Sequence, residues 1–158
     1  MSSFPRDENG VTLADTDWGL KAEKTMTFAG GTANDPGDYD GSGNPATLFT
    51  VTGEVQVRLL AVCITSLAGG SATIEVGLSG NTAAVIALTT ATNMVVGEFW
   101  HDASPDSAIE ESSVLKEFII VNGADIIQTV ATANITSGAI KYTCLWYPLS
   151  IGAKVEAA

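Results

Sequence analysis

EVQVRLLAVCI, residues 54–64, is the longest β-prone run in this chain. Side chains of a strand point alternately to its two faces. One face of this run is apolar throughout: Val55, Val57, Leu59, Ala61 and Cys63. The other face changes from polar to apolar along the run: Gln56, Arg58, Leu60, Val62 and Ile64. The run therefore predicts a strand with one side in the core, whose second half is covered on the other side as well.

Further short runs show the same alternation and are separated by residues that favour turns. In residues 73–78 the apolar side chains share one face, and in residues 139–149 Tyr142 and Trp146 share a face with Ile140 and Cys144. Asn122-Gly123 is a strong signal for a tight turn, because both residues accept a positive φ. The other expected strands are residues 24–29, 47–52, 83–88, 95–100, 116–121 and 124–133.

About eight or nine strands at this spacing predict an all-β sandwich or barrel. The length of 158 residues suggests one domain. Length and strand number favour a jelly-roll-like β-sandwich over a seven-stranded immunoglobulin sandwich. We expect the sandwich in residues 24–152, preceded by an extended, acidic N-terminal arm in residues 1–23 and followed by a short C-terminal tail in residues 153–158.

The charge of the chain argues against two classes of partner. Its formal net charge is −11, with only seven Lys and Arg and none between Arg58 and Lys116. Nucleic acids and anionic membranes are both bound mainly through basic side chains, so neither is expected as a partner. Charged residues make up only 16% of the chain, against about 25% on average. Such a surface suits contact with other subunits, because few ions must be desolvated; the alternative is a monomeric domain.

The sequence shows neither a secretory signal nor a membrane-spanning stretch. Residues 1–8 contain no apolar run like that of a secretory signal, and no stretch of about 20 apolar residues is present. We therefore expect synthesis in a cytoplasm. Cys63 and Cys144 lie in apolar runs and are expected to be buried and free, although a disulfide is the alternative.

The search for catalytic residues yields one weak candidate. His101 is the only histidine, and Asp102 and Ser104 lie beside it. A catalytic triad needs Ser, His and a carboxylate converging in space, and three neighbours on one loop rarely do so. The Gly-x-Ser-x-Gly turn is also absent. We therefore expect a loop histidine hydrogen-bonded to backbone, and no enzymatic activity.

One loop resembles half of a calcium site. Asp38-Tyr39-Asp40-Gly41-Ser42-Gly43 matches the first half of an EF-hand loop, with oxygen ligands expected from Asp38, Asp40 and Ser42. Position twelve should be Glu and is Phe49. A plain surface turn uses the same residue types, so calcium is one alternative and no other cofactor is expected.

Three aromatic or apolar residues are candidates for contact with partner subunits. Trp18 and Leu20 lie in the arm, which a partner could hold in place. Tyr147 points away from the face that carries Trp146, so it is the more exposed of the two aromatic residues.

Three segments carry a resemblance to a known class of proteins: GEFWHDASPD (97–106), NGADII (122–127) and CLWYPLS (144–150). They resemble small β-rich virion proteins encoded among the structural genes of tailed bacteriophages, over about residues 45 to 152. That class includes head decoration (cement) proteins, which form jelly-roll or related trimers on the capsid lattice, and also tail and fibre components.

The resemblance implies a non-enzymatic structural protein, made in the host bacterial cytoplasm and carried on the capsid surface. Its implied partners are copies of itself, as a homotrimer, and the major capsid protein. The alternative that it leaves open is a tail or fibre module that recognises a host glycan. It supplies no catalytic residues.

Overall fold

The computed structural model describes residues 19–31, 34–106 and 109–158, and these residues form an all-β structure with no α-helix, as the sequence predicts. Two single 3-10 turns, η1 (Ala91–Asn93) and η2 (Ser112–Val114), are its helical elements, and neither could cross a membrane. The strands are β1 (Leu20–Thr27), β2 (Ala46–Thr52), β3 (Val55–Ala68), β4 (Thr73–Leu78), β5 (Asn81–Thr90), β6 (Phe99–Trp100), β7 (Phe118–Ile120), β8 (Ile126–Ala131), β9 (Ser137–Pro148) and β10 (Lys154–Ala157).

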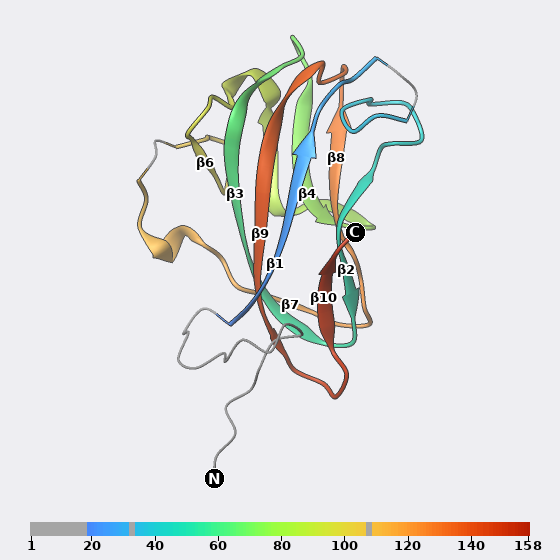
Figure 1. Ribbon diagram of the computed structural model, residues 1–158, viewed down its shortest axis with the longest axis vertical. Coiled ribbons are helices and arrows are strands. Elements are labelled where there is room, and N and C mark those ends of the chain that lie inside the picture. The colour runs from blue at the N-terminus through green and yellow to red at the C-terminus, as the bar shows by residue number, and fades with distance from the viewer. Residues whose placement is uncertain (1–18, 32–33, 107–108) are drawn as a thin grey trace.

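The strands form two antiparallel sheets of five strands each, packed as a sandwich (Figure 1). The first sheet has the order β1-β9-β3, with both β6 and β7 paired to the remaining edge of β3. The second has the order β10-β2-β8-β4-β5. The predicted β-sandwich is thus confirmed, with ten strands in place of eight or nine.

β6 and β7 are two halves of one interrupted edge strand. Phe99–Trp100 pairs with residues 62 and 61 of β3, and Phe118–Ile120 continues in the same direction along residues 57 to 55. Counted as one strand, they complete a nested set of pairs: β1 with β9, β2 with β8, β3 with β6/β7, and β4 with β5. This nesting of eight strands over two sheets is the jelly-roll order, and β10 is an addition to it.

The core lies between the sheets and is built from the alternating faces that the sequence indicates. The predicted inner face of β3 is buried along its length, as is that of β9 from Ile140 to Trp146. On the outer face of β3, Leu60 and Val62 are half-buried and Ile64 is 43% exposed. The expected outer cover of this strand is therefore partial from Leu60 to Val62 and absent at Ile64.

Two buried hydrogen bonds cross the core from one sheet to the other. The Tyr142 hydroxyl of β9 donates to Gln128 Oε1 of β8 over 2.7 Å. The Trp100 indole N–H of β6 donates to Thr89 Oγ1 of β5 over 2.8 Å. Buried polar groups are stable in a core when they are paired in this way, so these two bonds fix how the sheets face each other.

Three boundaries differ from those expected. Residues 20–23, assigned to the arm, form the first half of β1 and pair with β9. The expected C-terminal tail contains β10, which pairs with β2 and buries Val155. One inward apolar residue is enough for this short strand to form at the edge of the sheet. The strand expected at residues 95–100 is shortened to β6, because Gly97 adopts φ +88° and the Glu98 N–H donates to the Val95 carbonyl in a turn.

Candidate functional site

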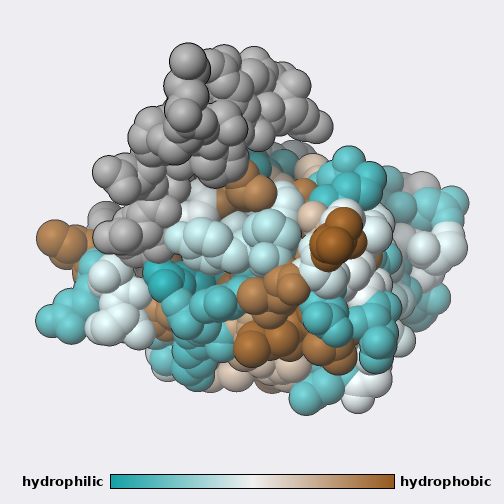
Figure 2. Space-filling view, turned by 90° about the horizontal axis from the view of Figure 1, so that it is seen from below, coloured by the Kyte–Doolittle hydropathy of each residue, from teal (hydrophilic) through white to brown (hydrophobic). Residues whose placement is uncertain are grey.

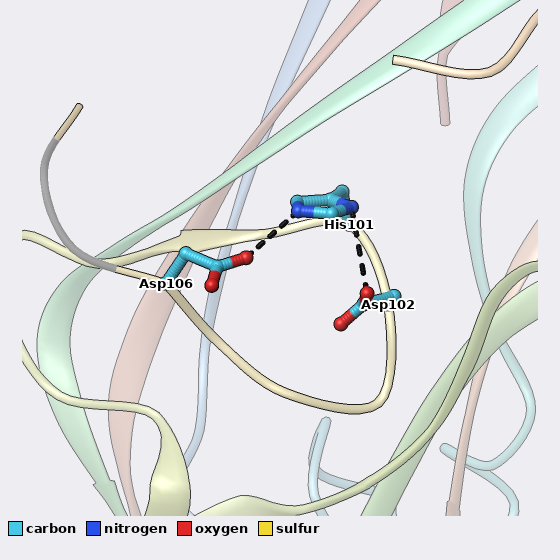
Figure 3. A group of neighbouring side chains, drawn as sticks. All are labelled: His101, Asp102 and Asp106. Atoms are coloured by element: carbon cyan, nitrogen blue, oxygen red, sulfur yellow. Dashed lines mark hydrogen bonds and ion pairs between the residues drawn. The ribbon is translucent and has the colours of Figure 1, made fainter. Parts of the chain in front are cut away.

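His101, Asp102 and Asp106 form the one group of three His, Cys, Asp or Glu side chains close enough to share a metal ion among the described residues (Figure 3). His101 follows β6, and backbone hydrogen bonds in both directions between Phe99 and Asp106 close the loop that carries it. Asp106 Oδ2 lies 2.8 Å from His101 Nε2, and Asp102 Oδ2 lies 3.9 Å from Nδ1. The imidazole also packs on the Phe99 ring, with 5.2 Å between ring centroids.

This geometry does not make a catalytic triad. Both imidazole nitrogens face carboxylates, whereas a triad needs one of them directed at the nucleophilic hydroxyl. Ser104 contributes its backbone N–H, which donates to Asp102 Oδ1 over 2.7 Å. Thr89 Oγ1 donates to the Asp102 carbonyl oxygen over 3.0 Å. The cluster closes the loop, and His101 is hydrogen-bonded to the Asp106 carboxylate, where the sequence suggested backbone.

Nor does the cluster have the form of a metal centre. Its three ligand atoms lie within 4.8 Å of one another. However, the two carboxylates lie at different nitrogens of the ring (Figure 3), whereas the ligands of one ion must point at a common centre. The arrangement suits hydrogen bonding of the imidazole.

The loop that resembles half of a calcium site is not supported by further ligands. Asp38 is buried, whereas Asp40 and Ser42 are exposed. In the part of the chain that the structure describes, no group of three acidic, histidine or cysteine ligands includes either aspartate. The calcium assignment stays a prediction.

Both cysteines are free and buried. Cys144 lies opposite Leu59 on β3, and Cys63 lies four residues further along that strand, which is about 13 Å at 3.3 Å per residue. This separation is too long for a disulfide. Burial raises the pKa of both thiols, that of Cys144 to about 12. Since the thiolate is the reactive form, neither residue is placed to act as a nucleophile.

Two of the three expected subunit contacts, Leu20 and Tyr147, lie among the described residues. Trp18 lies outside the described residues. Leu20 lies opposite Trp146 and packs half-buried against the core, and its contact with a partner stays a prediction. Tyr147 lies on the outer face of β9, opposite Gln56, and is half-buried. Its role at an interface stays a prediction.

Exposed apolar side chains lie beside Tyr147, and we call them the end patch: Ile119, Val121 and Leu149, with Ile151 in the turn two residues after Leu149. Ile119 and Tyr147 both pair with Gln56, one on each side of β3. Because faces alternate, Val121 and Leu149 lie on that same outer face, and the Leu149 N–H donates to the Glu54 carbonyl over 2.8 Å. The four side chains are between 47% and 106% exposed. Figure 2 looks onto this end of the sandwich and shows apolar residues gathered among polar ones.

The end patch was not identified from the sequence, although a signal was present. Residues 118–121 are apolar at every position, so one face of that strand had to remain apolar outside the core.

Comparison of the chain with protein-family models, with curated proteins and with solved structures gave no match. The function is therefore inferred from the chain's own residues.

Proposed function

We propose that this chain is a non-enzymatic virion structural protein that works by packing against other proteins, most specifically as a capsid decoration protein of a tailed bacteriophage. The observation that carries the packing role is the end patch. Exposed apolar side chains that lie together mark protein contact sites more often than single ones do. The most exposed members of the patch are Ile119 and Ile151, at 67% and 106%.

The virion assignment is supported by the resemblance of residues 97–106, 122–127 and 144–150 to phage structural proteins. The jelly-roll order is compatible with it, since viral capsid domains use this architecture, but lectins and cupins use it too. The partners under this proposal are other copies of the chain and the major capsid protein.

A physical reason connects such a surface to a cementing role. A subunit that buries about 1,000 Å² or more across a junction between capsomers can bind stably without any chemistry. Symmetric copies would place several such contacts at once, which raises the avidity of the assembly. The non-enzymatic part of the proposal is supported by the imidazole held between carboxylates and by the two buried thiols.

Binding to undecorated heads tests the proposal. The purified chain would be added to expanded heads of the phage that encodes it and compared with the variant Ile119→Ser/Leu149→Ser. Each removed side chain gives up about 1 kcal/mol of apolar burial, so the double variant should bind about 30-fold more weakly.

A matched control is Leu88→Ser/Val96→Ser, which removes two exposed apolar side chains away from the end patch. This control should bind heads like the unaltered chain. A strict monomer that does not bind heads would refute the proposal. Immunogold labelling at the tail tip would instead favour the tail or fibre alternative.

A further inference from the structure

A pocket of about 280 Å³ lies on the outer face of the first sheet, beside the connection between β6 and β7. Its apolar floor is formed by Leu60 of β3, Leu145 of β9 and Phe99 of β6. Glu110, Glu111, Ser112 and Leu115 of the connection complete its lining. Figure 1 shows this connection running beside β3.

The strand register explains why the floor is apolar. Leu145 pairs with Arg58 and Leu60 pairs with Thr143, so the two leucines are diagonal neighbours on one face of adjacent strands. Phe99 pairs with Val62 on the other side of β3 and shares that outer face. The pocket therefore uses the part of β3 whose outer face turns apolar.

The two glutamates give the pocket a negative rim. Both are exposed. Among the described residues, the ion pairs with Lys or Arg use Glu23, Glu117 and Glu156, so the rim glutamates take no part in them. The Glu111 carboxylate accepts a long hydrogen bond from Ser113 Oγ, over 3.4 Å. The carboxylates are thus placed to meet an external cation, in a chain whose net charge is already −11.

We propose that this pocket binds a lysine side chain presented by a protein partner. The four methylenes would lie on Leu60, Leu145 and Phe99, and the ammonium group would lie between Glu110 and Glu111. Lysine commonly buries its alkyl stem on apolar surface while its charged end stays near water. The volume lies just below the usual range of small-molecule pockets, about 300–1,000 Å³, which fits one side chain.

The same features disfavour other ligands. An anion would be repelled by the rim, and a bare metal ion would gain no ligand from the three apolar floor residues. That a protein carries the lysine rests on the function proposed above. The pocket's preference for an alkylammonium group does not rest on it.

Titration with n-hexylammonium, followed by the leucine methyl signals in NMR spectra, tests the pocket without any capsid. Hexan-1-ol and hexanoate are probes of the same chain length with no charge and with negative charge. We expect saturable shifts at the methyl groups of Leu60, Leu115 and Leu145 with hexylammonium. Binding should be at least fivefold weaker for hexanol, undetectable for hexanoate, and weakened by added salt.

The variant Glu110→Gln/Glu111→Gln should lower the affinity for hexylammonium at least fivefold and leave that for hexanol unchanged. Glu75→Gln/Glu156→Gln makes the same change in net charge outside the pocket and should leave both affinities unchanged. Equal binding of all three probes, no shift at the three leucines, or an equal loss in the control variant would overturn the proposal. Head binding by the end patch does not enter any of these outcomes, so the two proposals can fail separately.

Discussion

The substitution Tyr142→Phe is expected to lower the free energy of unfolding by about 1–3 kcal/mol. The Tyr142 hydroxyl donates to Gln128 Oε1 over 2.7 Å, and both side chains are at most 1% exposed. Phenylalanine keeps the ring and its packing, including the neighbouring Trp100 ring at 6.4 Å between centroids. What it removes is the donor, which leaves the amide oxygen of Gln128 without this partner in a region that water does not reach.

A double-mutant cycle separates this bond from packing effects. Gln128→Met alone strands the tyrosine hydroxyl and should cost a similar amount, whereas Tyr142→Phe/Gln128→Met replaces both polar groups by apolar ones. The double variant should therefore lie within about 1 kcal/mol of the unaltered protein. The coupling between the two sites would then be about 1–3 kcal/mol.

Urea unfolding followed by tryptophan fluorescence gives these free energies, with the slope m as a check that the same transition is compared. Burial raises the pKa of Tyr142 well above 10, so the hydroxyl keeps its proton over the whole neutral range. Two results would refute the reasoning. One is a loss below about 0.5 kcal/mol for Tyr142→Phe, and the other is a double variant whose loss equals the sum of the single losses.

Two further substitutions test other parts of the fold. The pKa of Cys144 is raised by burial from 9.0 to about 12, so the stability linked to its neutral form is complete below pH 9 and is lost between pH 9 and pH 12. This loss of unfolding free energy amounts to about 1.4 kcal/mol per pH unit. In urea melts between pH 8 and pH 11, Cys144→Ala should make the free energy of unfolding decline less steeply with pH. An unchanged decline would contradict this. Asn44 donates through Nδ2 to the carbonyls of Tyr39 and Val130, at 2.8 and 2.6 Å, and accepts from the Val130 N–H at 2.8 Å. Asn44→Ala should therefore lower the unfolding free energy by about 2–3 kcal/mol. The control Asn34→Ala, at an exposed position of the same loop, should have little effect. Equal effects of the two substitutions would contradict the role of Asn44.

The sandwich could be predicted from the sequence because local alternation in its central strands shows which face of each strand is buried. Every second residue is apolar from Val55 to Cys63 of β3 and from Ile140 to Trp146 of β9, and the faces that these residues form are buried in the structure. A period of two over such a length has one simple explanation, a strand covered on one side. Strand β10 lacked that signal, since Val155 is its one buried residue and Lys154 and Glu156 flank it.

The pairing of distant segments could not be read from the sequence. Glu110 and Leu145 line one pocket only because β3, β6 and β9 are neighbours in the folded sheet. The contact between His101 and Asp106 depends on the backbone bridge from Phe99 to Asp106, which has no periodic signature. Local alternation reports which face is buried, but it does not say which strand lies alongside.

The interruption between β6 and β7 is the feature that places the candidate surfaces. At its first end the loop is held by the Phe99–Asp106 bridge and by His101. At its second end the Glu117 carboxylate accepts hydrogen bonds from Gln56 Nε2 and Arg58 Nε, over 2.9 and 2.8 Å. The acidic rim lies on the chain between these two attachments, which limits how far it can move from the sheet.

The pocket and the end patch consequently share one face of the molecule. Leu145 of the pocket lies two residues before Tyr147 on β9, and Leu149 of the end patch lies two residues after it, all on the outer face. Two residues of a strand span about 7 Å, so one protein partner can cover both surfaces. Apolar burial at the end patch would supply most of the affinity, but it has no direction of its own. A lysine bound at the pocket would add a charge-dependent contact at a fixed distance, and that contact would set how the partner is oriented on the sheet.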